Sequence, residues 1–287
     1  MRMEKKQVKI GIIGYGFVGK AVEFGFSRNT VIKKIDPKLS TSVRDLESFK
    51  PEVCFLCLPT PMSINGQDSS IIESVVNEIN EIKINSIIVL KSTILPSAIE
   101  KISSFSKNPL VYNPEFLREK HYEYDFENPE MIILSGDNKS VKNIKELYSN
   151  HSICKSLNFV ELDISTASLA KYAINCFLAS KVVFFNQMKE IFDHQNCSQS
   201  WKEFVNAIAI DSRIGKSHMD VPGHDGKKGF GGACFPKDTY ALLQYAKELN
   251  LDFELLQRVI EINNNYRNDY DELDEREKEQ NVFFEKK

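Results

Sequence analysis

A glycine-rich turn between two apolar runs constrains the fold of this 287-residue chain more than any other feature. Val8–Ile13 is apolar and rich in β-branched residues, and it leads directly into Gly14-Tyr-Gly-Phe-Val-Gly19. A helix-like segment follows, and then a second apolar run, 31–35, which ends in Asp36. Strand, G-x-G-x-x-G, helix and strand, with an acid about 20 residues after the glycines, is the pattern that binds a dinucleotide. The sequence therefore predicts a Rossmann-type strand–helix–strand unit at its N-terminal end.

Each part of this pattern predicts a contact with the cofactor. The first glycine makes the tight turn, the second lets the pyrophosphate approach the backbone, and the third packs the helix on the strand. The N-terminus of the helix offers N–H groups to the phosphates. The acid accepts hydrogen bonds from the adenosine ribose and opposes a 2′-phosphate, which favours NAD over NADP. An ordinary βα turn is the alternative. The predicted contacts are Gly14, Gly16, Phe17, Val18, Gly19 and Asp36.

Strand-like and helix-like patterns continue to alternate up to about residue 160. Such alternation, with short connections, predicts a parallel sheet covered by helices on both faces. Ligands of these sheets bind outside the carboxyl ends of the strands. We therefore expect one site built from the loops that follow the strands predicted at 53–58, 86–90 and 110–113. Further cofactor contacts predicted in these loops are Pro59, Thr60, Ser92 and Thr93.

After residue 160 the pattern is helical, beginning with an uninterrupted periodic run at 164–194. The predicted fold class is α/β, with a Rossmann-like doubly wound parallel sheet at 1–160 followed by an all-helical central and dimerisation domain at 161–270. Residues 271–287 are rich in charge, and we expect a solvated helix end or a disordered tail there.

Composition argues against several classes of partner and site. A net charge of −3 gives no reason to expect nucleic acid or an anionic membrane. We expect no membrane span and no signal peptide, and the dispersed cysteines favour a reducing, cytoplasmic location. Cys54 and Cys57 form a C-x-x-C within a predicted strand, where they face opposite sides and belong to the core. His218 and His224 lack partners at ligand spacing, so we expect no metal site.

A second glycine-rich stretch, 226–238, places Cys234 among four glycines and three lysines. Positive charge favours the thiolate, which is the nucleophilic form of cysteine. A helix predicted at 239–249 places the thiol near a helix N-terminus, which lowers its pKa further. A glycine-rich loop with an inert thiol is the alternative.

Two carboxylates and an amine–amide pair complete the candidate groups. Glu115 and Glu119 stand four residues apart after a predicted strand, with Arg118 between them. If that turn is helical, both carboxylates face one side and suit general-base or water-orienting work, although a pair of surface charges is the alternative. Lys171 and Asn175 stand at i and i+4 of the long predicted helix and hence on one face.

Six segments together resemble the nucleotide-sugar dehydrogenases, most closely the UDP-glucose 6-dehydrogenases. They stand in that family's order and spacing, at 14–19, 91–93, 113–119, 171–175, 213–223 and 229–238. The resemblance implies that a primary alcohol is oxidised to a carboxylate by two hydride transfers to NAD, with a cysteine thioester between them. A homodimer formed through the long helices is also implied, and UDP-glucose or a related sugar nucleotide is the implied substrate.

The resemblance assigns a role to each matching residue. Cys234 captures the aldehyde, Lys171 stabilises the oxyanion, and Glu115 activates the hydrolytic water. Asn175 and Asp238 hold water and substrate, and Arg213 reaches the sugar bound by the partner subunit. Glu119 and Thr93 are assigned to the nicotinamide side, and Lys237 is a further predicted cofactor contact. The remaining implied sugar-nucleotide contacts are Phe116, Leu117, Arg118, Phe230 and Gly231.

Departures from the family leave other functions open. Family members usually carry a second Rossmann-like domain after the helical one, and we expect it to be absent here. The open alternatives are a dehydrogenase for a GDP-mannose-type or UDP-N-acetylhexosamine-type substrate, a non-catalytic NAD-binding homologue, and one half of a split enzyme. A split enzyme would require a separate uridine-binding chain.

The fingerprint generates a prediction about cofactor choice. We expect strong preference for NAD over NADP, and we expect Asp36→Ala to narrow it, because the substitution removes the carboxylate that opposes a 2′-phosphate. Calorimetric titration with each cofactor measures both affinities. Comparable affinities for NAD and NADP in the unsubstituted chain would contradict the assignment of Asp36.

Overall fold

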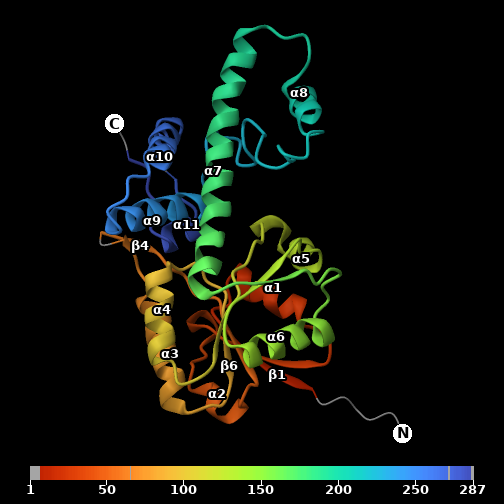
Figure 1. Cartoon of the computed structure of the whole chain (residues 1–287), viewed down its shortest axis with the longest axis vertical. Helices are drawn as coiled ribbons and strands as arrows, with labels where there is room; N and C mark the ends of the chain where they lie inside the picture. Colours follow the sequence, from red (N-terminus) through yellow and green to blue (C-terminus); the bar gives the residue numbers. More distant parts are fainter. Residues whose placement is uncertain (1–6, 65, 271, 286–287) are drawn as a thin grey trace. The chain divides into compact units, whose positions relative to one another are not determined.

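The computed structural model describes residues 7–64, 66–270 and 272–285 of the chain (Figure 1). These residues form two compact units, which are described separately. The first comprises residues 1–60 and 68–171, and the second comprises 61–67 and 172–287. The division falls inside the long helix rather than at residue 160, because that helix continues without a break from one unit into the other.

The first unit is built on a parallel sheet of five strands in the order β2-β1-β3-β6-β7. Ligands of such sheets bind where the strand order reverses, which here is between β1 and β3. A parallel pair, β8 and β9, continues from β7 through an antiparallel bridge between Tyr112 and Ser135. The strands are β1 (Val8–Ile13), β2 (Thr30–Ile35), β3 (Val53–Leu56), β6 (Ile87–Leu90), β7 (Leu110–Tyr112), β8 (Ile132–Leu134) and β9 (Phe159–Glu161).

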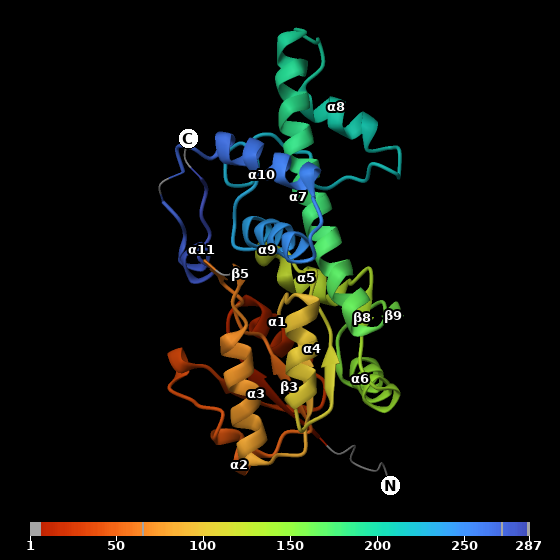
Figure 2. The same cartoon turned by 60° about the vertical axis from the view of Figure 1, so that its left-hand side comes forward.

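Helices cover both faces of this sheet, with α3 and α4 on one side and α1 and α6 on the other (Figures 1 and 2). Side chains of β3 alternate between the two cores: Cys54 and Leu56 face α3 and α4, and Phe55 faces α1 and α6. The doubly wound sheet predicted from the sequence is confirmed. The helices are α1 (Phe17–Gly25), α2 (Asp45–Phe49), α3 (Ser70–Ile82), α4 (Pro96–Phe105), α5 (Tyr122–Glu127) and α6 (Asn138–His151), with short 3-10 turns at Pro37–Leu39 and Glu119–His121.

The second unit is helical apart from a small hairpin of β4 (Met62–Ser63) and β5 (Gly66–Gln67). Its central element is α7 (Ile164–His194), which buries Cys176, Ala179 and Val183 against the helices and loop that follow. The other helices are α8 (Trp201–Ile208), α9 (Phe235–Glu248), α10 (Glu254–Tyr266) and α11 (Glu275–Glu279).

By length and composition alone α7 could cross a membrane, so the expectation that no run approaches such a span is wrong on that criterion. About 44% of the apolar window of this helix is buried, and Cys176, Ala179 and Val183 belong to the core of the second unit.

The charged C-terminal segment also differs from the prediction. Its described part forms α11 and then returns along the hairpin, where the Met62 N–H donates to the Gln280 carbonyl over 3.1 Å (Figure 2). Glu277 is completely buried and Val282 is 4% exposed. For the described residues, the expectation of a solvated or disordered tail is wrong. Contacts with residues distant in the sequence order this segment although it is rich in charge.

A buried polar cluster joins the carboxyl ends of β6 and β7 in the first unit. Lys91 is 4% exposed, and its Nζ donates to Asn113 Oδ1 over 3.0 Å. The Tyr148 hydroxyl donates to the same oxygen over 2.7 Å, while Asn113 Nδ2 donates to the Ile133 carbonyl. Burial lowers the pKa of Lys91 to about 8. Lys91 therefore fixes the two strand ends from which the loops of the predicted site begin.

The depressed pKa of Lys91 gives a pH dependence with a definite sign. Between pH 8 and the ordinary lysine value of 10.5, the unfolded chain keeps a proton that the folded chain releases, so stability rises with pH. We expect the free energy of unfolding of the wild type, relative to Lys91→Met, to increase by about 3 kcal/mol across that window. Urea denaturation at several pH values measures this difference.

Lys107→Met, at an exposed lysine of the same unit, is the matched control. Equal pH slopes for Lys91→Met and Lys107→Met would show that burial does not displace the proton from Lys91.

Candidate functional site

The three glycines of the first turn have three different surroundings. Gly14 has a φ of +87°, and a Cβ there would lie 2.4 Å from the Cys57 carbonyl oxygen. A Cβ on Gly19 would lie 2.2 Å from the Gly14 oxygen, so helix α1 could not pack this closely with a larger residue. A Cβ on Gly16 would meet nothing within 4 Å. The open space beside Gly16 is where a phosphate can approach the backbone.

The start of α1 is suited to an anion. Gly16 is its N-cap and has no side chain to satisfy the first N–H groups. Phe17 and Val18 form the first turn, where the helix dipole is positive. Asp36 follows β2 directly, and its Oδ2 accepts from the Tyr15 N–H over 2.7 Å. This bond ties the glycine turn to the end of β2 and leaves further lone pairs for a ribose.

Polar side chains join the loops after β3 and β6. The Thr60 hydroxyl donates to the Thr93 carbonyl over 2.8 Å. The Ser92 hydroxyl donates to the Leu58 carbonyl over 2.7 Å and accepts from the Leu58 N–H. Pro59 lies between these contacts. The loops that carry four of the predicted cofactor residues are thus held together at the carboxyl edge of the sheet.

Two of the predicted catalytic residues, 56 positions apart, meet in the first unit. Lys171 Nζ donates to the Glu115 carbonyl oxygen over 2.5 Å and lies 3.7 Å from its carboxylate. The same ammonium lies 4.8 Å from the ring centroid of Phe116. Glu115 is 9% exposed and Lys171 is 3% exposed, so each ion limits the cost of burying the other.

The expected pairing of Glu115 with Glu119 is not formed. Residues 114–118 are not helical, because the Glu115 carboxylate accepts from the Leu117 N–H over 2.6 Å and closes a local turn. Glu119 begins a short 3-10 turn and is exposed. Arg118 is also exposed and pairs with Asp125 over 2.6 Å.

In the second unit, Cys234 is the N-cap of α9. The helix begins at Phe235, four residues before the predicted start, because Pro236 is compatible with its first turn and Asp238 supplies the acid favoured there. The Cys234 side chain makes no capping hydrogen bond to this turn, and the residue is half-buried. A thiolate at this position is stabilised by the positive end of the helix.

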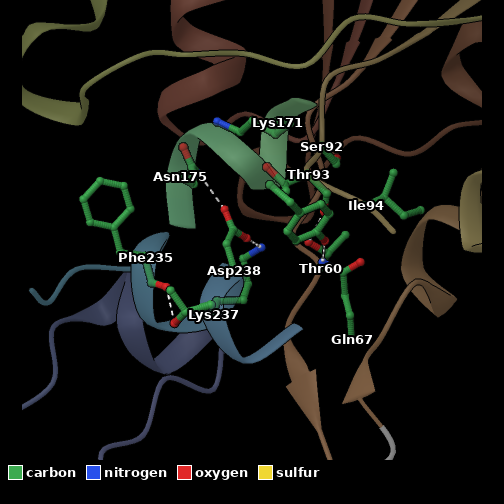
Figure 3. Close-up of polar contacts among 12 residues, drawn as sticks. Thr60, Gln67, Ser92, Thr93, Ile94, Lys171, Asn175, Phe235, Lys237 and Asp238 are labelled. Carbon is green, nitrogen blue, oxygen red and sulfur yellow. Dashed lines mark hydrogen bonds and ion pairs between the residues drawn. The ribbon is translucent and has the colours of Figure 1, made fainter. Parts of the chain in front are cut away.

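Asp238 is the centre of a buried polar group one turn into α9. Its Oδ2 accepts from Asn175 Nδ2 over 2.6 Å, and its Oδ1 pairs with Lys237 Nζ over 2.5 Å (Figure 3). Asn175 follows Lys171 by one turn of α7. Asp238 is 1% exposed and Lys237 is 5% exposed.

The lysines of the glycine-rich stretch have partners of their own. Lys237 pairs with Asp238, Lys228 pairs with Glu190, and Lys227 lies 4.2 Å from the ring centroid of Tyr270. The start of α9 is a further feature that favours a thiolate at Cys234. Sequence spacing could not show these pairings, because most of the partners are distant in the chain.

The predicted substrate contacts of the second unit have mixed environments. Phe230 is 4% exposed and packs with Ala179, Val183 and Val259, so its side chain is part of the core. A Cβ on Gly231 would lie 2.8 Å from Arg267 Nη1. The Arg213 side chain is 87% exposed and pairs with Asp211.

Sequence reasoning missed the side chains that hold the glycine-rich loop. Asn186 Oδ1 accepts from the Gly229 N–H over 3.1 Å. Asn263 binds Phe230 twice: its Oδ1 accepts from the N–H over 2.6 Å and its Nδ2 donates to the carbonyl over 3.0 Å. The only signal in the sequence is an asparagine within an apolar helical pattern. Among residues 7–64, 66–270 and 272–285, no three His, Cys, Asp or Glu side chains cluster as a metal site.

Sequence comparison identifies both parts of the chain. Residues 28–152 match the NAD-binding domain of the UDP-glucose/GDP-mannose dehydrogenase family, and residues 165–265 match the central domain of the same family. A UDP-glucose 6-dehydrogenase of Rickettsia felis is 30% identical over 78% of this chain and 50% of its own length. The UDP-glucose 6-dehydrogenase TuaD of Bacillus subtilis is 32% identical over 75% of this chain and 47% of its own length. The chain thus spans about half the length of these relatives.

Solved structures show the same fold at lower identity. A UDP-glucose dehydrogenase from Pyrobaculum islandicum superposes with a TM-score of 0.76 at 22% identity, covering 94% of this chain and 71% of that one. A UDP-D-ManNAc dehydrogenase from Pyrococcus horikoshii gives 0.70 at 21% identity, with coverages of 89% and 68%. The sequence matches, together with the glycine turn and its uncapped helix, show that the first unit binds NAD and that the chain belongs to the UDP-glucose/GDP-mannose dehydrogenase family of nucleotide-sugar dehydrogenases.

Proposed function

We propose that this chain oxidises the C6 hydroxyl of UDP-glucose to a carboxylate, in two steps, through a thioester on Cys234. The observation that carries the proposal is the position of Cys234 at the N-cap of α9, one turn before the buried Asp238. A binding module needs neither a thiol at a helix N-terminus nor a buried carboxylate beside it. The names of the sequence relatives support UDP-glucose as the substrate.

The proposed chemistry balances with the groups that the chain provides. NAD, when bound, accepts a hydride in each oxidation. The first oxidation removes a hydride from C6 and a proton from its hydroxyl, and gives an aldehyde. The Cys234 thiolate adds to the aldehyde carbon, and loss of a second hydride gives the thioester. Water then displaces the thiolate and leaves the carboxylate.

Glu115 and Lys171 have complementary roles in this proposal. The Lys171 ammonium is buried and positive, so it stabilises negative charge that develops on the C6 oxygen. The Glu115 carboxylate, 3.7 Å from that ammonium, is the proposed base for the hydrolytic water. Asn175 and Asp238 are assigned to the thiol side, because their mutual hydrogen bond fixes the first turn of α9. Glu119 is exposed, and its proposed role is a contact with the nicotinamide side of the cofactor.

Other sugar nucleotides stay as the second candidate class. Solved structures of similar fold include enzymes for UDP-D-ManNAc and GDP-mannose, and at 21–23% identity they establish the fold without choosing the sugar. The resemblance of the segments 113–119 and 221–226 to those of UDP-glucose 6-dehydrogenases favours that substrate.

We also propose that the chain is a homodimer formed through α7. Three large apolar side chains, Phe177, Phe184 and Ile191, recur every seven residues along this helix and are 68%, 60% and 55% exposed. A seven-residue apolar repeat on an exposed helix face is typical of a helix–helix interface. All six cysteines are free, which suits a reducing compartment, and we propose a cytoplasmic location.

The thioester generates the main prediction. We expect the chain to produce NADH with UDP-glucose, and we expect Cys234→Ser to lower carboxylate formation by roughly 10³-fold or more while NAD binding stays intact. The reason is that a serine hydroxyl is a poor nucleophile near neutral pH. NADH absorbance, product analysis and calorimetry measure the three quantities.

Cys197→Ser, at an exposed cysteine, is the matched control and should leave all three unchanged. A parallel panel of UDP-glucose, a UDP-N-acetylhexosamine and GDP-mannose decides the substrate. Unchanged turnover in Cys234→Ser would exclude the thioester, and faster turnover of another sugar nucleotide would replace UDP-glucose.

A further inference from the structure

The C-terminal segment contributes a buried carboxylate to the loop that precedes Cys234. Glu277 Oε1 accepts from the Gly232 N–H over 2.8 Å. Its Oε2 accepts from the Tyr270 hydroxyl over 2.8 Å and from the Asp274 N–H over 2.9 Å. Glu277 is completely buried, whereas the neighbouring Glu275 and Glu279 are exposed. Each oxygen of this carboxylate is satisfied, as a buried charge requires.

Arg267, the C-cap residue of α10, binds the same loop. Its Nη2 donates to the Gly229 carbonyl over 2.9 Å, and its Nη1 pairs with Asp225 over 2.7 Å. The guanidinium also lies 5.2 Å from the ring of Tyr270, whose hydroxyl binds Glu277. Burial, followed by the bond to Glu277, raises the pKa of Tyr270 to about 12, so this hydroxyl stays a donor.

The loop depends on these contacts because its own conformational preferences are weak. Gly229 and Gly232 have φ values of +71° and +76°, a region that L side chains rarely adopt. Glycine reaches many other conformations equally well, so the sequence alone does not select this one. Gly232 lies two residues before Cys234, and its N–H is held by Glu277. Of the loop contacts named above, this bond lies nearest in the chain to Cys234.

We propose that Glu277 is a positioning residue for the Cys234 thiol. By holding Gly232, it fixes the path on which the loop enters α9 and keeps the thiol at the N-cap, where the helix stabilises the thiolate. The consequence for turnover rests on the proposed function, but the position of the thiol is measurable without any substrate.

The test uses alkylation of Cys234 by iodoacetamide in the full chain carrying Cys197→Ser, with modification located by peptide mass spectrometry. We expect Glu277→Ala to raise the pH midpoint of alkylation by about one unit and to slow the reaction at pH 7 roughly tenfold, because the thiol moves away from the helix end. Glu277→Gln keeps an oxygen acceptor for Gly232 and should restore the rate to within about twofold. Glu279→Gln is the matched control on the same helix.

Two further measurements separate positioning from general damage. Calorimetry should show unchanged NAD binding in every variant, since the cofactor fingerprint lies in the other unit. If Glu277→Ala does not fold, Tyr270→Phe takes its place as the test. This substitution removes one hydrogen-bond donor to Glu277 and should slow alkylation of Cys234 about twofold. An unchanged pH profile of alkylation in Glu277→Ala, or in Tyr270→Phe if that variant replaces it, would overturn the proposal. Equal losses of alkylation rate in Glu277→Ala and Glu277→Gln would overturn it as well. A shifted profile in a chain that oxidises no sugar nucleotide would refute the proposed function and leave the positioning role intact.

Discussion

Two helix N-termini without side-chain caps are the features on which the proposed chemistry of this chain depends. α1 begins after Gly16 and α9 begins after Cys234, and in the described structure neither N-cap side chain bonds to the first turn. Uncapped N–H groups and the helix dipole together attract negative charge. The same physical property therefore suits a phosphate in the first unit and, in the proposed mechanism, a thiolate in the second.

The two glycine-rich loops that lead into these helices are stabilised in different ways. Gly14 is fixed by close contact with the adjacent strand, where a Cβ would overlap the Cys57 carbonyl, and Gly19 is fixed by contact with Gly14 itself. The contact between Gly19 and Gly14 lies within the motif itself, and Cys57 directly follows β3, the strand beside β1, so both constraints belong to the pattern of a Rossmann sheet. The loop before Cys234 is held by side chains from α7, α10, the C-cap of α10 and α11, namely Asn186, Asn263, Arg267 and Glu277. A local sequence pattern does not predict such contacts, so the sequence predicted the loop but not the side chains that hold it.

The same distinction separates the elements that the sequence predicted from the side-chain contacts that it did not. The order of strands and helices follows from apolar periodicity, and it predicted the sheet and the long helix. The pairing of Glu115 with Glu119 depended on a helical turn that the Glu115 side chain itself prevents. Phe230 was assigned to the substrate because it lies in the motif, but its ring fills the core beside Ala179 and Val183. Whether a loop side chain packs in the core or faces a ligand depends on neighbours that are distant in the sequence.

Buried charged side chains lie close in the sequence to the Cys234 thiol and hold the start of α9. Asp238 is neutralised by Lys237 and hydrogen-bonded by Asn175, and removing one member of such a group typically costs about 3–5 kcal/mol. The proposed nucleophile also lies at the end of α9. The field of a helix end falls off within its first turn, so it acts only on a thiol held in place. In the proposed mechanism a loop fixed by buried side chains is therefore a condition for the reaction, and this gives a role to the fully buried carboxylate in an otherwise charged C-terminal segment.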